Sequence, residues 1–162
     1  MTVPAFRPLI PADETALVLL FRTICEDPTS SGFRPHSFDA ETAARLVRHG
    51  GRDAYVVAAA ADGTLVAYGM LRGWDEGFAV PSLGIYLVPR MRGTGVVERL
   101  MRDLHGVAAR SGATQVRLTV DAWNERAIRL YRRLGYRLRP HAQPGRLEGI
   151  IDLAHQPPTA GT

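Results

Sequence analysis

Two short stretches of the sequence combine residue types that could do chemistry. The first runs from Arg90 to Gly95 and places Gly93 and Gly95 directly before an apolar-faced helical pattern. Backbone N–H groups at the start of a helix have no intrahelical partner, and glycine lets a ligand approach them closely. Together with the helix dipole and the neighbouring arginines, this turn predicts a site for an anion such as a pyrophosphate.

The second stretch is a helical pattern that follows Asn124, contains Tyr131 and ends at Gly135. A tyrosine hydroxyl can donate a proton to a leaving group as a general acid. Both polar residues also have a purely structural interpretation, because asparagine is a good N-cap and tyrosine a common core aromatic. The spacing predicts that the buried stripe of this helix consists of Ala127, Leu130, Tyr131 and Leu134.

Several other kinds of site are excluded by single residue types. A dinucleotide-binding turn needs a third glycine where Glu98 stands. All 20 basic residues are arginine, so the chain has no lysine for a P-loop, a Schiff base or a nucleophile. Cys25 is the single cysteine, which excludes a disulfide framework and a thiolate metal cluster, and we expect no metal.

The composition is that of one globular domain. The chain has 162 residues, of which 46% are hydrophobic and 22% charged. The longest apolar run, 55–61, is too short to span a membrane, and the N-terminus lacks a signal-peptide pattern. We therefore expect a cytoplasmic protein without a membrane partner. The net charge of +4 favours an anionic ligand, but the arginines of the last helix lack the aromatic interleaving of a nucleic-acid binder.

Periodicity and turn residues predict a mixed order of elements that would position the two motifs. We expect one domain over 1–155, followed by a flexible tail over 156–162. The predicted strands cover 4–10, 54–60, 64–71, 82–88, 116–120, 136–141 and 147–153. The predicted helices follow Asp13 and Asp39 as N-caps and then cover 95–110 and 125–134. This order indicates an α/β domain with a partly antiparallel sheet.

The two motifs, in this order and with these elements between them, resemble the signatures of the GNAT acetyltransferase superfamily. They read Arg90-x-x-Gly93-x-Gly95 and Asn124 followed by Leu130-Tyr131-x-x-Leu134-Gly135-Tyr136, and the resemblance covers roughly 54–139. One departure is Val97, where the family usually has a small residue. The resemblance implies an α/β (α+β) fold with a mixed, mostly antiparallel sheet of about seven strands and about four helices. In this family the strands equivalent to 82–88 and 116–120 are parallel and splayed.

The resemblance also implies acetyl-CoA as co-substrate and transfer of its acetyl group to an amine by direct attack. Tyr131 would be the general acid, and a main-chain N–H near Tyr86 or Leu87 would stabilise the oxyanion. The cofactor-binding residues that it implies are Tyr86, Leu87, Val88, Arg90, Arg92, Gly93, Thr94, Gly95, Val96, Asn124 and Tyr131.

The base and the acceptor are less defined by the sequence. Some family members have a glutamate where this chain has 80–82, which holds Val, Pro and Ser. The nearest carboxylates, Asp75 and Glu76, are expected as the base or as acceptor contacts, together with Phe33, His36 and Trp74 as acceptor-binding residues. A small-molecule amine such as an aminosugar is the expected acceptor. A peptide N-terminus, a non-catalytic acetyl-CoA-binding module and a homodimer remain open.

Overall fold

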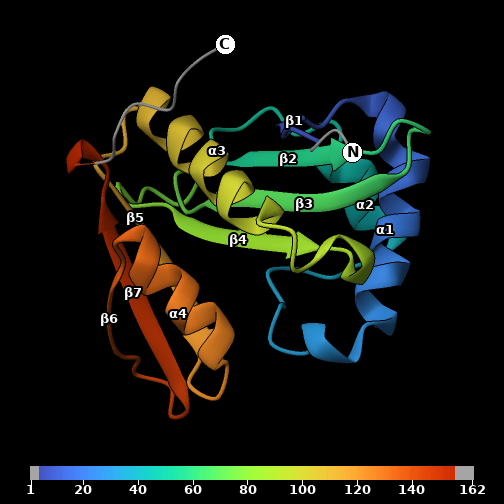
Figure 1. The fold of residues 1–162 in the computed structure, drawn as a ribbon. Coiled ribbons are helices and arrows are strands. Elements are labelled where there is room, and N and C mark those ends of the chain that lie inside the picture. Colours follow the sequence, from blue (N-terminus) through green and yellow to red (C-terminus); the bar gives the residue numbers. More distant parts are fainter. Residues whose placement is uncertain (1–3, 156–162) are drawn as a thin grey trace.

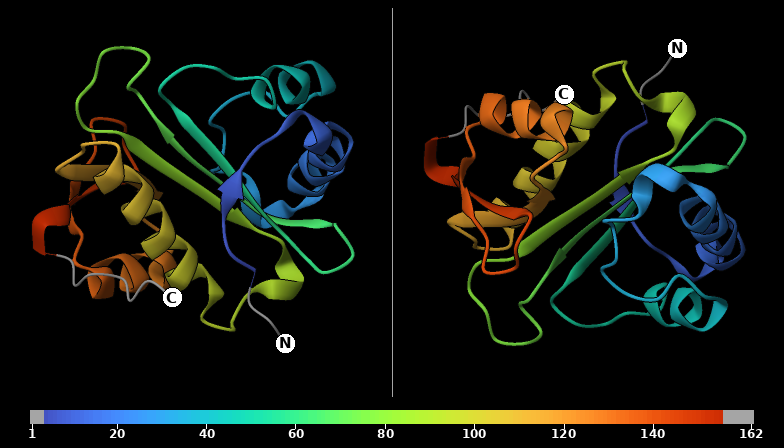
Figure 2. Two further views of the ribbon diagram at one scale, coloured as in Figure 1. Left: turned by 90° about the horizontal axis from the view of Figure 1, so that it is seen from above. Right: turned by 90° about the horizontal axis from the view of Figure 1, so that it is seen from below.

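The computed structural model describes residues 4–155 as one seven-stranded sheet with helices on both faces. The strand order is β1-β2-β3-β4-β5-β7-β6, and all neighbours are antiparallel except β4 and β5. Helices α3 and α4 cover one face, and α1 and α2 cover the other (Figures 1 and 2). The predicted mixed, mostly antiparallel α/β fold is therefore confirmed. The strands are β1 (Arg7–Pro8), β2 (Ala54–Ala59), β3 (Leu65–Arg72), β4 (Ser82–Leu87), β5 (Gln115–Asp121), β6 (Arg137–Pro140) and β7 (Arg146–Asp152). The helices are α1 (Glu14–Glu26), α2 (Ala40–Leu46), α3 (Val96–Arg110) and α4 (Glu125–Leu134).

The N-terminal segment differs from the prediction in two respects. The first strand is only two residues long, because a short 3₁₀ turn begins at Pro11. Asp13 precedes α1 but does not cap it. Its carboxylate instead accepts a hydrogen bond from Ile10 N at 2.9 Å and forms an ion pair with Arg7 at 2.8 Å. Asp13 therefore connects strand β1 to the start of α1 instead of capping the helix. Asp39 does cap α2, because its carboxylate accepts a hydrogen bond from Thr42 N at 2.8 Å.

The parallel strands β4 and β5 separate soon after they meet. Within residues 4–155 their ladder holds the single residue pair Ser82 and Arg117, supported by Arg117 N donating to Pro81 O at 3.0 Å. Beyond this point β5 and its neighbours turn away from β4 (Figure 1). The splayed parallel pair that the family resemblance implied is therefore present, and it leaves one edge of β4 without a strand partner.

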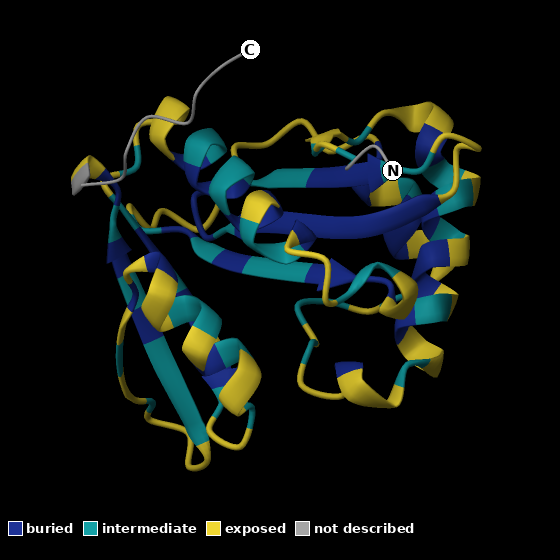
Figure 3. Ribbon diagram, viewed as in Figure 1, coloured by how far each residue is buried: buried dark blue, intermediate teal, exposed yellow. Residues whose placement is uncertain are grey.

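Helix α3 contributes to both hydrophobic cores of the molecule. Val96 and Leu100 belong to the core under α1 and α2, and Met101 and Leu104 belong to a second core that joins residues of β2 to β4 with residues of β5 and β7. Strand β3 is buried along almost its whole length between these layers (Figure 3). None of the helices within residues 4–155 is long and apolar enough to cross a membrane. The predicted tail over 156–162 lies outside the described residues.

Helix α4 buries a slightly different stripe from the predicted one. Ile128 and Leu134 are buried, while Ala127, Leu130 and Tyr131 are half-buried. The prediction omitted Ile128, which shares the turn of Asn124 at a spacing of four residues. Of the three half-buried residues, Tyr131 lines the gap between β4 and β5, and Leu130 packs against the core.

A buried histidine of α3 contacts a buried tyrosine that follows α4. His105 of α3 is 4% exposed, and its Nε2 atom is 2.6 Å from the hydroxyl of Tyr136. Its Nδ1 atom is buried and has no hydrogen-bond partner among the described residues. Burial, with a smaller effect of Arg102, lowers the pKa of His105 from its ordinary 6.5 to about 4. The imidazole is therefore neutral at physiological pH.

This burial is expected to make the fold acid-sensitive between about pH 6.5 and 4. Because the folded-state pKa is lower than the unfolded one, the unfolded chain takes up a proton first as the pH falls, which destabilises the fold by up to about 3 kcal/mol. Urea unfolding of the wild type and of His105→Gln at pH 7 and pH 5 measures this loss. The variant is expected to lose less stability between the two pH values. An equal loss in both proteins would show that His105 is not the acid-sensitive group.

Candidate active site

The gap between β4 and β5 opens into a pocket of about 360 Å³. Its walls come from both faces of the sheet, because the strands do not pair there. One wall is the loop between α1 and α2 at 32–35, and the opposite wall includes Tyr131 of α4. Phe33 and Glu76, two of the predicted acceptor contacts, also line it, as do Gly84 and Thr119. The pocket therefore brings together residues that are about a hundred positions apart in the sequence.

Tyr131 reaches this pocket from the α4 side. Its ring lies 5.8 Å from that of Tyr136, which fixes its position. Burial raises the pKa of Tyr131 from 10 to about 12. The phenol therefore keeps its proton throughout the neutral range, as a general acid must, and the position agrees with the role that the family resemblance implied.

The edge of β4 that faces the gap carries main-chain donors. Val88 N donates to Val66 O of β3 at 2.9 Å, so the even-numbered residues of β4 point their N–H groups toward β3. The N–H groups of Ile85 and Leu87 consequently face the gap. Leu87 was predicted as an oxyanion donor and fits, but the N–H of Tyr86 points the wrong way. Ile85 was missed, although the two-residue alternation of strand 82–88 could have identified it.

The glycine turn follows β4 at the open end of the gap. Gly93 has a φ of +81° and Gly95, the N-cap of α3, a φ of +78°. A side chain added at Gly95 would meet nothing within 4 Å, so the start of the helix is open to a ligand. Arg126 of α4 lies next to the turn, with its Nη2 atom 3.6 Å from where a Cβ of Gly93 would be. Arg126 was not predicted, because its nearness to Gly93 depends on how α4 packs.

Three of the predicted cofactor residues have local structural roles. The Thr94 hydroxyl donates to Met91 O at 2.9 Å, and the Asn124 side chain accepts a hydrogen bond from Ala127 N at 3.2 Å as the N-cap of α4. The Val96 side chain is buried in the core. Their main-chain groups and the Asn124 amide N–H₂ group stay candidates for ligand contacts. Arg90 is exposed beside the turn, as expected. The N–H group of Val88 donates to Val66 O of β3 and is not available to a ligand.

The side chain of Arg92, predicted as a cofactor contact, is held by partners within the protein. Its Nη2 atom pairs with Asp27 at 2.6 Å, Nη1 donates to the Thr29 hydroxyl at 2.8 Å, and Nε donates to Leu87 O at 3.0 Å. Asp27 also accepts a hydrogen bond from the Tyr86 hydroxyl at 2.9 Å. Burial alone would raise the pKa of Asp27, but the hydrogen bonds from Thr29, Arg92 and Tyr86 hold it well below its usual range.

Asp27 therefore connects the end of α1 to β4 and to the glycine turn. Replacing Asp27 by alanine is expected to destabilise the fold by about 3 kcal/mol, because it leaves a half-buried guanidinium unpaired. Asp39→Ala removes an ordinary N-cap and is expected to cost about 1 kcal/mol. Urea unfolding at pH 7 compares the two variants, and an equal or smaller loss in Asp27→Ala would contradict the connecting role.

Three of the predicted acceptor contacts lie elsewhere. Trp74 is 4% exposed and belongs to the core with Leu71 and Leu83, because the chain turns inward after β3. Asp75 points away from the pocket: it accepts hydrogen bonds from Arg52 N at 2.6 Å and Asp53 N at 3.3 Å, and it lies 3.0 Å from His49 Nε2.

His36 is also occupied by its neighbours. Its Nε2 atom is 2.7 Å from the Tyr68 hydroxyl, and its ring packs against Phe21 and Phe38. Burial lowers the pKa of His36, so the ring is neutral within this aromatic cluster. His36 is therefore a packing residue beneath the loop that forms the pocket wall.

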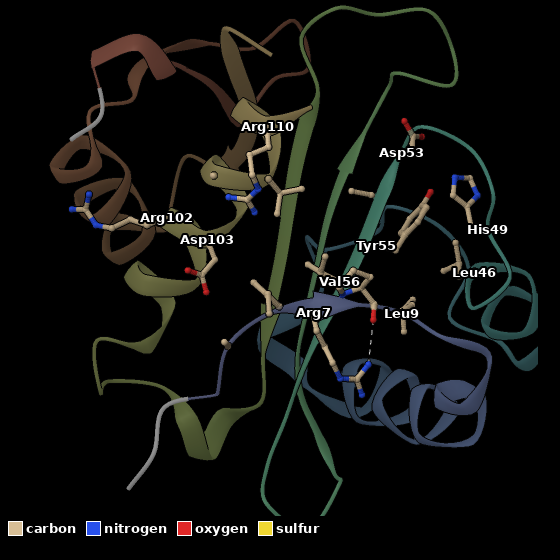
Figure 4. Close-up of a pocket in the computed structure, with 16 residues that line it drawn as sticks. Arg7, Leu9, Leu46, His49, Asp53, Tyr55, Val56, Arg102, Asp103 and Arg110 are labelled. Carbon is tan, nitrogen blue, oxygen red and sulfur yellow. Dashed lines mark hydrogen bonds between the residues drawn. The ribbon is translucent and has the colours of Figure 1, made fainter. Parts of the chain in front are cut away.

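A larger cavity of about 510 Å³ lies elsewhere in the molecule. It runs between β1 and β2 on one side and α3 on the other, with Arg7, Tyr55 and Arg102 around it (Figure 4). It contains neither the glycine turn nor Tyr131 nor any other predicted site residue. The candidate active site is therefore the smaller pocket in the gap.

Comparisons with known proteins identify the family of the chain. The model of the acetyltransferase (GNAT) family matches residues 19–136. An uncharacterised N-acetyltransferase of Mycobacterium tuberculosis is 38% identical over 84 residues, or 51% of this chain and 53% of that protein. The thialysine N-epsilon-acetyltransferase of Mus musculus is 39% identical over 51 residues, or 32% and 30% of the two chains. The chain thus spans at most about half the length of these curated relatives.

A solved structure shares the whole fold. The phosphinothricin acetyltransferase of Sinorhizobium meliloti, in complex with acetyl-CoA, superimposes with a TM-score of 0.72 over 99% of this chain and 95% of that chain. Its sequence identity of 22% makes this a likeness of fold. The family match covers most of the sequence and includes the glycine turn and the whole helix that carries Tyr131. The chain belongs to the GNAT acetyltransferase family.

Proposed function

We propose that this protein is an N-acetyltransferase that moves an acetyl group from acetyl-CoA to a primary amine of a small molecule. The observation that carries the proposal is the convergence of three elements on one gap. The anion-binding turn at Gly95 lies at its open end, the N–H groups of Ile85 and Leu87 line one edge, and the Tyr131 phenol enters from α4.

The residues at the open end fit the phosphate groups of acetyl-CoA. The first turn of α3 offers N–H donors, and Arg90 and Arg126 supply positive charge beside it. The unpaired edge of β4 offers peptide groups of the kind that pantetheine amides can bond. When bound, the coenzyme supplies the acetyl thioester. The acetyl-CoA in the Sinorhizobium meliloti neighbour supports this choice of co-substrate.

The chemistry follows from the groups around the gap. The amine nitrogen attacks the thioester carbonyl carbon, so a C–N bond forms and the C–S bond breaks. The N–H groups of Ile85 and Leu87 would stabilise the oxyanion, and Tyr131 would give its proton to the departing thiolate. The proton lost by the amine goes to Glu76, which lines the pocket, or to water. Asp75 takes no part, because backbone groups and His49 hold it elsewhere.

The size of the pocket favours a small acceptor. A volume of about 360 Å³, closed on one side by 32–35, suits a metabolite-sized amine. The name of the Mus musculus relative, a thialysine N-epsilon-acetyltransferase, also points to a small amine. A peptide N-terminus is the second candidate, and a module that binds acetyl-CoA without turnover is the third.

A thiol-release assay separates these alternatives. The protein is mixed with acetyl-CoA and a panel of small amines and short peptides, and free thiol is followed over time. Release with small amines is expected. Preferential release with peptides would favour the second candidate. A thermal shift with acetyl-CoA but no release with any amine would overturn catalysis and leave a binding module.

A further inference from the structure

The floor of the pocket holds a row of arginines that the proposed function does not use. Arg72 of β3 stands opposite Ser82 of β4, which stands opposite Arg117 of β5, so the three side chains share one face of the sheet. Arg146 of β7 stands opposite Asp121 at the end of β5. All three arginines line the pocket. We call Arg72, Arg117 and Arg146 the arginine row.

The arginine row is only partly neutralised by the protein. Within residues 4–155, neither Arg72 nor Arg117 forms an ion pair with a carboxylate. Arg72 donates to Pro35 O, and its Nε atom is buried without a hydrogen-bond partner. The Arg117 guanidinium lies over the Phe78 ring, 5.8 Å from its centre.

The third arginine has one acidic neighbour. Arg146 Nε lies 3.5 Å from Asp121 Oδ1, and this Nε atom also has no hydrogen-bond partner among the described residues. Glu76 is the acidic residue that lines the pocket, whereas Arg34 adds a fourth guanidinium to its wall. The pocket therefore has an excess of positive charge and buried donors without acceptors, which favours an anionic group in it.

The charge of Arg72 and Arg117 is remote from the phosphate site, whereas Arg146 stands opposite Asp121, four residues further along β5. Arg72 and Arg117 flank Ser82 at the closed end of the gap, while the glycine turn follows Leu87 at the other end of β4. Five residues of extended strand span about 16 Å. An anion bound by these arginines is therefore not a coenzyme phosphate. It belongs to a different ligand, such as the acceptor that binds together with the coenzyme.

We propose that the acceptor carries a carboxylate as well as the amine that is acetylated, and that Arg72 and Arg117 of the arginine row bind this carboxylate. The proposal rests on the proposed function, since it names the class of acceptor for that reaction. A guanidinium matches a carboxylate in shape through two parallel hydrogen bonds. Unmodified aminosugars lack this group, so the pocket disfavours the acceptor that the sequence suggested.

Binding experiments test the acceptor class without requiring turnover. Calorimetry on the protein saturated with coenzyme A compares a panel of amino acids with their own carboxamides and with diamines of similar length. The amino acid that binds best is expected to bind at least about tenfold more tightly than its carboxamide, because only the charge of the carboxylate differs. A diamine or carboxamide that binds as tightly, or no binding by any amino acid, would overturn the proposal.

Variants locate the effect on the arginine row. Arg117→Gln removes a guanidinium that makes no hydrogen bond within the described residues, and it is expected to abolish most of the preference for the carboxylate. Arg129→Gln removes an exposed arginine of α4 and is expected to keep it. If both variants keep the preference for the carboxylate, the assignment of Arg117 is contradicted. Thiol release measured in parallel separates the two hypotheses, because amino acids that bind without releasing thiol would overturn the proposed function and leave the arginine row supported.

Discussion

Replacing Tyr131 by phenylalanine is expected to lower turnover by about 10²- to 10³-fold, the range that a single general acid contributes. The phenylalanine ring keeps the contact with Tyr136, so the fold and the pocket stay intact. The dissociation constant for acetyl-CoA should change little, because the phenol acts on the leaving thiolate. Steady-state thiol release and calorimetry with coenzyme A measure the two quantities.

Tyr136→Phe is the matched control. It removes a phenol on the neighbouring ring that bonds His105 and does not line the pocket. This variant is expected to lose stability while keeping its turnover. The role assigned to Tyr131 would be wrong if the two variants turned over equally fast, or if Tyr131→Phe lost activity only through weaker acetyl-CoA binding.

Replacing Gly95 by valine is expected to weaken acetyl-CoA binding by more than about tenfold. A β-branched residue in the left-handed region at φ +78° costs about 1–3 kcal/mol of backbone strain, and the turn can relieve it only by moving its N–H groups. The new side chain would also stand at the open helix start where we place the phosphates. Calorimetry with coenzyme A measures the loss.

Gly112→Val provides the same strain at the other end of α3. Gly112 has a φ of +92° and, like Gly95, open space around its Cβ position. This variant is expected to lose a similar amount of stability in urea unfolding and to bind acetyl-CoA normally. Equal weakening of binding in both variants would mean that the effect comes from general loss of stability.

Most of the fold follows from features that lie close together in the sequence. The hairpin over β2 and β3 depends on a turn that ends at Gly63, which has a φ of +87°. Helix α3 has its N-cap at Gly95 and α4 has Asn124, both named by the motifs. Even the N–H of Ile85 is predictable, because alternation along β4 decides which groups face β3 and which face the gap.

Several predicted site residues are held by partners far away in the sequence. Arg92 finds Asp27 across 65 positions, and Asp75 finds the backbone of Arg52 across 23 positions. A charged loop residue and a charged ligand contact have the same local pattern, so the sequence could not separate them. The arginine row has the same origin: Arg72 and Arg117 share a floor only because β3, β4 and β5 pair in one register.

The splay of β4 and β5 also makes the molecule mechanically two half-sheets. Their shared ladder is one residue pair wide, so the joint depends on packing, in which α3 takes part because its side chains enter both cores. The same helix begins at the turn that we assign to the coenzyme phosphates. A coenzyme lying along the unpaired edge of β4 would occupy the position of the missing ladder and press on the helix that joins the halves. Occupancy of the site and stiffness of the whole sheet would then rise and fall together.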